Sequence, residues 1–217
     1  GKLHQQPATG GAVQPLVTNG GSDFELFPAY SRDGSQIVYV SWDDNRLGEL
    51  RVVGAAGGEA RAISKTPGHY RRPQFSPDGR FVVFEAGGGG GLTSDAWGAQ
   101  PGIYLLDIAS GQTRRITDDG SEPHFGANGD RIFFSKGAGG KLALVSTDLS
   151  GEAERTHASG EMVSGYLLAP DGKTLYFTAR LSDAAEPTST NLDIYASDLS
   201  GAAPKLLTAS NKATDTT

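Results

Sequence analysis

The chain has 217 residues, including 31 glycines, 11 prolines and no cysteine, and its formal net charge is −6 at pH 7. The absence of cysteine excludes disulfides, thiolate zinc sites and cysteine nucleophiles. The acidic balance disfavours nucleic-acid binding, and no uninterrupted apolar run approaches the length of a membrane-spanning helix. A glycine-rich chain of modest apolar content is typical of short strands joined by tight turns. We therefore expect an all-β protein that neither binds nucleic acid nor inserts into a membrane.

The first predicted element in chain order is a β-hairpin over residues 3–17, which turns at Gly10 and Gly11. After it, the chain repeats a unit of two hairpins about every 40–50 residues. No segment keeps a helical period of 3.6 residues over three turns, so a helical interpretation fails.

The first hairpin of each unit turns at an Asp-Gly or Asn-Gly pair. Glycine takes the positive φ that a tight hairpin requires, and Asp or Asn tolerates it. The strand after each turn is aromatic and β-branched, as expected for a sheet buried on both faces. A proline is predicted to start the inner strand, where no ladder donor is needed, but Tyr166 replaces it in the fourth copy. The four copies are Phe27–Gly34, Arg72–Gly79, Glu122–Gly129 and Gly165–Gly172.

A second hairpin follows each of the first ones, so that every unit has four antiparallel strands. This spacing is typical of a β-propeller blade. The turns of these second hairpins lie at Gly57-Gly58, Ser110-Gly111, Ser150-Gly151 and Ser200-Gly201. The predicted blade units are 1–18 (partial), 19–64, 65–117, 118–157 and 158–209, with 210–217 as the start of a further blade or a tail.

The order of these motifs resembles a known repeat: Leu-Thr, a short loop, Pro-x-aromatic-Ser-Pro-Asp-Gly, an apolar strand, Ile-Tyr, then Asp-x-x-Ser-Gly. It resembles the WD-like repeat of TolB and of tricorn-type propellers. Residues 3–178 are most similar to the propeller that precedes a metal-dependent amidohydrolase domain in some exported bacterial proteins. Three segments carry this closer likeness, namely Gly102–Tyr104, Asp119–Gly126 and Leu144–Leu149.

The first hairpin of each unit is expected to lie on the inside of its blade and the second on the outside. With the hairpin over residues 3–17 counted as an outer one, the chain has five outer hairpins but only four inner ones. About 4.5 blades are therefore expected in this chain. Propellers close with 4–8 blades, so we interpret the chain as part of a six- to eight-bladed propeller. The rest of the propeller or another chain is expected to complete the ring.

No catalytic, cofactor-binding or metal-binding residue is predicted. Gly172-Lys173-Thr174 lacks the upstream glycine of a phosphate-binding loop, and a Gly-x-Ser-x-Gly nucleophile elbow is absent. Acidic residues at Asp43, Asp44 and Asp193 lack the spacing of a dedicated calcium loop. The four histidines are scattered without the spacing of a metal site, at His4, His69, His124 and His157.

A binding face is expected where the loops between middle strands and the loops between blades open together. Both tryptophans are placed there, in loops rather than strands, together with acidic residues and an aromatic and basic cluster. These residue types are enriched at interfaces, and long loops often carry function. The predicted binding residues are Trp42, His69, Tyr70, Arg71, Arg72, Trp97, Glu122 and His124.

Three functions are compatible with this pattern. The first is a non-catalytic module that binds a protein or peptide in the bacterial cell envelope, with a periplasmic or secreted location implied by the resemblance. The second is the propeller domain of a larger, amidohydrolase-type hydrolase whose catalytic domain lies outside this sequence. The third is a propeller enzyme of the polysaccharide lyase type, for which His69, Arg71, Arg72 and His124 are the only candidates near the axis.

Overall fold

The computed structural model describes residues 1–87, 100–138, 141–160, 162–169, 171–180, 192–200 and 202–208. These residues form strands and turns. Within these ranges no helix is long and apolar enough to cross a membrane. In the described part of the chain, eighteen strands make up one two-stranded sheet and four four-stranded antiparallel sheets. The predicted all-β propeller architecture of about 4.5 blades is confirmed.

Each four-stranded sheet is one blade, and its strands follow in chain order from the inside outward. The two-stranded sheet is formed by β1 (His4–Gln5) and β2 (Gln14–Pro15). The first blade contains β3 (Phe24–Tyr30), β4 (Gln36–Asp43), β5 (Leu47–Gly54) and β6 (Arg61–Ala62). The second contains β7 (Tyr70–Phe75), β8 (Phe81–Ala86), β9 (Gly102–Asp107) and β10 (Gln112–Thr117). The third contains β11 (Ser121–Phe125), β12 (Arg131–Ala138), β13 (Lys141–Asp148) and β14 (Arg155–Gly160). The fourth contains β15 (Met162–Leu168), β16 (Leu175–Arg180), β17 (Asp193–Ser197) and β18 (Lys205–Leu206).

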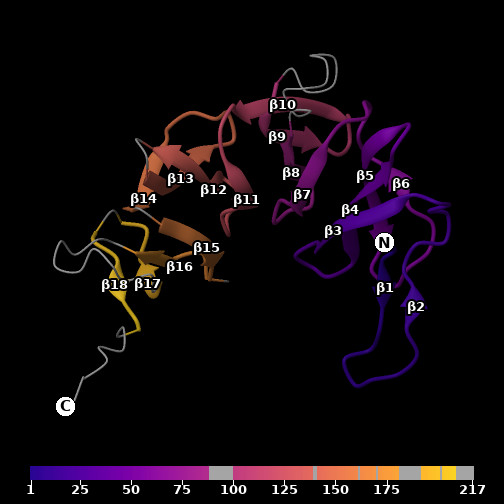
Figure 1. The fold of residues 1–217 in the computed structure, drawn as a ribbon, viewed down its shortest axis with the longest axis horizontal. Helices are drawn as coiled ribbons and strands as arrows, with labels where there is room; N and C mark the ends of the chain where they lie inside the picture. Colours follow the sequence, from indigo (N-terminus) through magenta and orange to yellow (C-terminus); the bar gives the residue numbers. More distant parts are fainter. Residues whose placement is uncertain are drawn as a thin grey trace, which may run out of the picture.

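The blades stand side by side in an arc that is open on one side (Figure 1). The innermost strands β3, β7, β11 and β15 line the concave side, and β14 and β18 lie toward the outer rim. β14 runs to Gly160, past the blade boundary expected at residue 157. This arrangement brings residues from four separate sequence repeats together around one space.

The first turns of the first two blades are held by their own side chains. In the first blade, the Ser31 hydroxyl donates to the Asp33 carboxylate at 2.6 Å and accepts from the Gln36 amide at 2.9 Å. The second blade repeats these bonds from Ser76 to Asp78 at 2.5 Å and from the Phe81 amide at 2.8 Å. Bonds from neighbouring serines lower the pKa of Asp33 to about 2. The predicted positive φ of the turn glycines is confirmed at Gly34, Gly79, Gly129 and Gly172.

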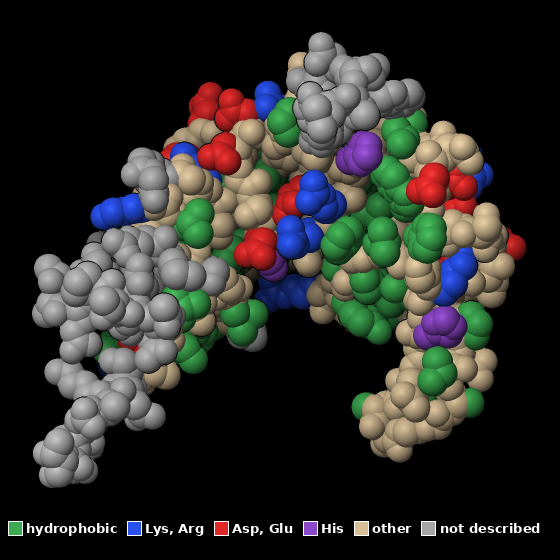
Figure 2. Space-filling model, in the orientation of Figure 1, with side chains coloured by type: hydrophobic (Ala, Val, Ile, Leu, Met, Phe, Trp, Pro, Cys, Tyr) green, Lys and Arg blue, Asp and Glu red, His purple; other side chains and the backbone are tan. Residues whose placement is uncertain are grey.

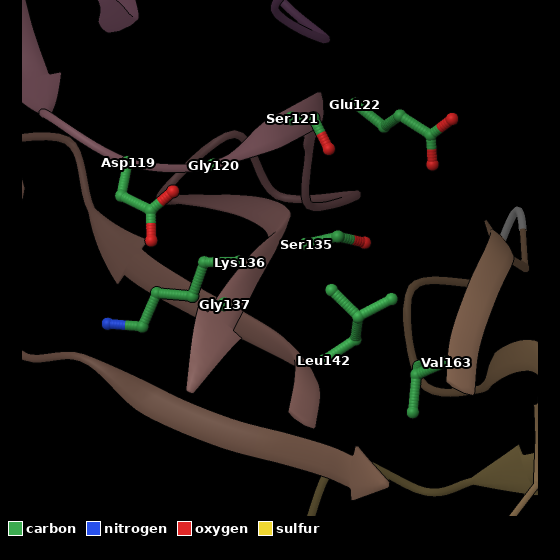
Figure 3. A pocket seen from close by; sticks show the side chains of 9 residues that line it. All are labelled: Asp119, Gly120, Ser121, Glu122, Ser135, Lys136, Gly137, Leu142 and Val163. Atoms are coloured by element: carbon green, nitrogen blue, oxygen red, sulfur yellow. The ribbon is translucent and has the colours of Figure 1, made fainter. Parts of the chain in front are cut away.

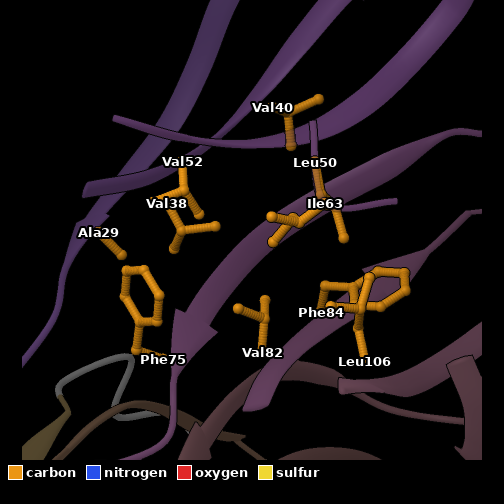
Figure 4. Packing of buried hydrophobic residues seen from close by; sticks show 10 residues of the cluster. All are labelled: Ala29, Val38, Val40, Leu50, Val52, Ile63, Phe75, Val82, Phe84 and Leu106. Atoms are coloured by element: carbon orange, nitrogen blue, oxygen red, sulfur yellow. The ribbon is translucent and has the colours of Figure 1, made fainter. Parts of the chain in front are cut away.

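The core consists of layers between successive blades (Figure 4). Side chains alternate along each middle strand, so that Val38 and Val40 of β4 face the second blade, against Val82 and Phe84 of β8. Val83, the residue between the last two, faces the third blade instead. The middle strands of the first three blades are therefore buried on both faces, as predicted from their apolar runs.

The fourth blade differs, because one of its faces is exposed. Leu175 and Phe177 pack on the third blade, whereas Tyr176 is 38% exposed and Ile194 is 41% exposed. The prediction of a strand buried on both faces is wrong here, since no sheet of the described ranges covers this side. The residues at the matching positions of the other blades are at most 4% exposed, namely Val38, Val83 and Phe133 for Tyr176, and Leu50, Ile103 and Leu144 for Ile194.

Candidate functional site

A β-bulge in each innermost strand sets the geometry of the concave side. The pairing of the inner strand with its neighbour shifts at the same place in all four blades. The residue in the bulge has a positive φ, which costs a non-glycine residue about 1–3 kcal/mol. Bulges re-aim side chains, and here they turn them toward the centre of the arc. The bulge residues are Phe27 (φ 54°), Arg72 (φ 46°), Glu122 (φ 57°) and Gly165 (φ 55°).

Pro28, Pro73 and Pro123 directly follow the bulge residues, inside the inner strand and not at its start. The predicted strand start is therefore wrong by several residues. The inner strand is the edge of its sheet, so a proline in its middle leaves no ladder bond unmade.

A pocket of about 330 Å³ lies where the bulges of different blades meet. It combines an exposed aromatic ring, a guanidinium, a carboxylate and an imidazole. Figure 2 shows basic and acidic side chains next to one another on the concave side of the arc. The pocket is lined by Phe27, Pro28, Arg72, Gln74, Glu122, His124, Gly165 and Tyr166. We call this set the channel pocket.

Arg72 is held at the channel pocket by the buried carboxylate of Glu85 in β8. Its Nη1 donates to Glu85 Oε1 at 3.1 Å and to Oε2 at 3.3 Å, while the Arg72 side chain as a whole stays 44% exposed. Glu85 Oε1 also accepts from the backbone amide of Glu122 at 2.7 Å. One carboxylate thus positions the bulges of two neighbouring blades and leaves the cation available to a ligand.

Tyr166 of the fourth blade closes the other side of the channel pocket by reaching to the third blade. Its hydroxyl donates to the carbonyl oxygens of Glu122 and Phe133, the second at 2.9 Å, and His124 Nδ1 lies 3.2 Å from it. Burial, and secondarily the charges of Glu122 and Glu85, raise the pKa of Tyr166 well above its usual value. The phenol therefore remains a donor at neutral pH and ties the two blades together.

A second group of predicted residues lies at the end of β4, on the side where the β4–β5 turn and the β6–β7 connection meet. We call this side the loop face. The Trp42 ring packs on His69 with 4.9 Å between centroids, and Trp42 Nε1 donates to Asp44 at 2.8 Å. Tyr70 packs edge-on against the buried Phe84 ring and donates its hydroxyl to the Thr66 carbonyl at 2.7 Å. The loop face therefore carries aromatic side chains that are held in place by these contacts.

The structure thus divides the predicted binding residues between two places. Trp42 and His69 meet on the loop face, whereas Arg72, Glu122 and His124 meet in the channel pocket. The prediction that Trp42 lies in a loop is wrong, because it belongs to β4 and pairs with Phe24 and Gly48. Tyr70, Arg71 and Arg72 likewise lie in β7, and Trp97 lies outside the described residues.

Sequence reasoning missed Phe27 and Tyr166 of the channel pocket, and also Glu85, which holds Arg72 in place there. The position directly before the proline of each repeat was the available signal, because it holds the bulge residue in three blades. Tyr166 replaces that proline in the fourth repeat, and this departure from the pattern was a second signal, since its hydroxyl donates to the Phe133 carbonyl of the third blade.

Metal binding finds no support in the described part of the chain, where no three His, Cys, Asp or Glu residues are grouped as ligands. Asp43 accepts from the amides of Asn45 and Arg46, and Asp44 accepts from Trp42. These carboxylates already serve the β4–β5 turn.

His157, away from both groups, is half-buried beside Ser146 and Arg131. Ser146 Oγ accepts from Arg131 Nε at 2.9 Å and lies 2.8 Å from His157 Nε2, so the imidazole and the guanidinium share one hydroxyl. Burial, followed by the charges of Arg131 and Arg155, lowers the pKa of His157 from 6.5 to about 4. The unfolded chain therefore binds a proton at higher pH than the folded chain does.

We expect His157 to make the protein less stable as the pH falls from about 6.5 toward about 4, because its folded-state pKa is depressed. Urea unfolding at pH 7 and pH 5 measures this, and the His157→Gln variant should lose less stability between the two values than the wild type. His4→Gln, at an exposed position, is the matched control. An unchanged pH dependence in His157→Gln would contradict the assignment.

The chain matches known proteins over nearly its whole length. A family model described as the TolB beta propeller domain matches residues 8–217. The Tol-Pal system protein TolB of Gluconobacter oxydans (strain 621H) is 30% identical over 223 residues, which cover 81% of this chain and 47% of that protein. The uncharacterized peptidase YuxL of Bacillus subtilis (strain 168) is 26% identical over 167 residues, which cover 74% of this chain and 23% of that protein. This chain thus spans less than half of either relative.

Solved structures share the fold. TolB from Acinetobacter baumannii superimposes with a TM-score of 0.70 and 23% identity, over 95% of this chain and 48% of that one. Oligogalacturonate lyase from Vibrio parahaemolyticus gives a TM-score of 0.66 at 13% identity, over 90% of this chain and 57% of that one. At these identities the likeness concerns the fold alone. Because the family model covers residues 8–217 and the blades repeat as the sequence predicted, the chain belongs to the TolB β-propeller domain family.

Proposed function

We propose that this chain is a non-catalytic propeller module that binds a protein or peptide segment in the bacterial cell envelope. The observation that carries the proposal is the channel pocket, where three non-glycine bulge residues with positive φ turn their side chains to one space. Such strain persists where the surrounding structure holds it, and it clusters at ligand sites. A periplasmic or secreted location is part of the proposal, supported by the similarity to TolB.

The chemistry of the pocket suits a polypeptide. Phe27 offers an apolar surface that is 39% exposed, and Arg72 offers donors to a carbonyl or carboxylate. The Trp42 and His69 rings offer a second aromatic surface, on the loop face. Aromatic residues and arginine dominate binding energy at protein interfaces.

Site-specific photocrosslinking tests the proposal. A benzoylphenylalanine at position 27 or 69 should crosslink polypeptide from an envelope extract of the producing bacterium. The same group at Gln36, beside the Asp-Gly turn on the opposite face, should not. Equal labelling from all three positions, or none from 27 and 69, would overturn the proposal.

A second candidate is that the chain is the propeller domain of a larger hydrolase. The similarity to the uncharacterized peptidase YuxL, of which this chain covers 23%, favours it. The larger hydrolase of this proposal is either a peptidase or an amidohydrolase-type enzyme. Hydrolysis of peptide or amide substrates by the whole natural protein, lost on deletion of the sequence outside residues 1–217, would distinguish it from a binding module.

We also propose that a further blade, from the same protein or another chain, covers the exposed face of the fourth blade. The support is that Tyr176 and Ile194 occupy positions that are buried between blades everywhere else in the arc. For the 217-residue chain alone, we expect self-association that weakens in the double variant Tyr176→Ser with Ile194→Ser, measured by sedimentation velocity. Val13→Ser, on the exposed β1–β2 hairpin, is the control. Identical sedimentation of all three proteins would contradict this use of the face.

A further inference from the structure

The same three positions recur at the bulge of every blade, and comparing them shows what the third blade lacks. The first position is the residue before the bulge, and the second is the bulge residue itself. The third is the residue of the neighbouring strand that pairs with the first position. In the second blade they are Arg71, Arg72 and Glu85, and Arg72 pairs with Glu85. This blade thus contains both charges of an ion pair. The first blade has only apolar residues there, namely Leu26, Phe27 and Val40.

The third blade has the acid without its counterion. Its three residues are Ser121, Glu122 and Ser135, with Ser121 paired to Ser135. The Glu122 carboxylate, at the position of Arg72, has no hydrogen bond or ion pair with any described residue. Ser135, at the position of Glu85, is only 8% exposed, and its hydroxyl has no hydrogen-bond partner among the residues that the structure describes. A buried hydroxyl without a partner costs about 1–3 kcal/mol, which a ligand donor would recover.

A pocket of about 430 Å³ lies at these residues, between the third and fourth blades. Figure 3 shows the hydroxyls of Ser121 and Ser135 and the Leu142 side chain directed to one space, with Val163 of the fourth blade across from Leu142. Leu142 is 41% exposed and so offers apolar surface to an incoming group. We call this the acidic pocket.

We propose that the acidic pocket takes the side chain of a basic residue, arginine or lysine, from a bound peptide segment. The alkyl stem would lie along Leu142 and Val163, and the cationic head would donate to the Glu122 carboxylate and the hydroxyl of Ser135. Arginine and lysine bury their stems on apolar surface while presenting only donors at the head. This inference rests on the proposed binding function and names the chemistry of the partner.

Other ligand classes match the lining less well. An anion would face the Asp119 and Glu122 carboxylates, and the ammonium of Lys136 is already paired with Glu154 at 2.5 Å. A purely apolar side chain would leave both Glu122 and the Ser135 hydroxyl without a partner. The overall formal charge of −6 also favours association with a basic segment.

Peptide titrations followed by amide NMR of the whole chain test the proposal. The probes are Ac-Gly-Arg-Gly-NH2, its citrulline analogue, which keeps the shape without the charge, and free L-arginine. The arginine tripeptide should shift the amides of Gly120, Ser121 and Ser135 saturably. The citrulline tripeptide should bind at least about tenfold more weakly, because hydrogen bonds to charged groups are stronger than those between neutral groups.

Two variants place the effect in the acidic pocket. Glu122→Gln should weaken the arginine tripeptide about tenfold, to the level of citrulline. Ser135→Val, which installs the residue type of Val40 in the first blade, should fill the site and abolish the shifts while the fold is kept. Asp118→Asn, an exposed acid outside the pocket lining, should bind as the wild type does.

Equal binding of the arginine and citrulline tripeptides, or of wild type and Glu122→Gln, would overturn the inference, as would no shift with any probe. Free L-arginine binding as tightly as the tripeptide would overturn the assignment to a peptide. Crosslinks from positions 27 and 69 would leave the binding function standing in each of these cases, so the two proposals fail separately.

Discussion

Replacing Gly120 with alanine is expected to destabilise the protein by about 3 kcal/mol or more. Gly120 has a φ of +122°, a conformation that residues with a Cβ rarely adopt. An added Cβ would lie 2.7 Å from Phe134 Cδ2 and 3.0 Å from Ile103 Cδ1. Both of those side chains are fully buried between the second and third blades, so neither has room to move. Backbone strain and overpacking therefore act together, and urea unfolding measures their sum.

A control variant and a second background test the prediction for Gly120, and the second background separates overpacking from strain. Gly54→Ala is the control, because its φ is not positive and its added Cβ would meet only the Gly57 carbonyl oxygen, at 3.8 Å. It should change stability by less than about 0.5 kcal/mol. In a Phe134→Leu background the cost of Gly120→Ala should shrink, since the atom nearest the new Cβ is withdrawn. A Gly120→Ala protein as stable as Gly54→Ala would contradict the close packing of this blade interface.

The blades could be predicted from sequence because their signals are local. Ser31, Asp33 and Gly34 form a turn through bonds among themselves, and the same residue types recur in the second blade at Ser76, Asp78 and Gly79. Each such turn fixes the strands on either side of it, so repeat spacing and strand order follow. The apolar runs then specify burial on both faces wherever a neighbouring blade is present.

The candidate site could not be predicted in the same way, because contacts between blades create it. Glu85 reaches the amide of Glu122, and Tyr166 reaches the carbonyl of Phe133, across separations of 37 and 33 residues. No local propensity favours a positive φ at Arg72 or Glu122, since residues before proline prefer extended conformations. The sequence indicated which residues lie near the face, but their grouping depends on how the blades pack.

The Tyr166→Ala variant should lose about 3 kcal/mol of stability, and Tyr166→Phe about 1–2 kcal/mol. The hydroxyl donates to two carbonyl oxygens of the third blade, and the ring fills the contact beside His124 at a centroid distance of 5.1 Å. Phenylalanine keeps the ring and loses the bonds, so the difference between the variants separates packing from hydrogen bonding. Tyr30→Phe, whose ring is 64% exposed on the inner strand of the first blade, should be neutral.

The loss should be uneven along the arc, which amide hydrogen exchange can resolve. Successive blades touch mainly their neighbours, so a broken contact between the third and fourth blades should release β15–β18 before it affects β3–β6. Exchange should therefore rise in the fourth blade of Tyr166→Phe and stay unchanged in the first. A uniform rise would show that the arc unfolds as one unit, and no rise would show that the hydroxyl bonds do not hold the blades together. Because Tyr166 also lines the channel pocket, a local release would tie ligand binding in the channel to the order of the fourth blade.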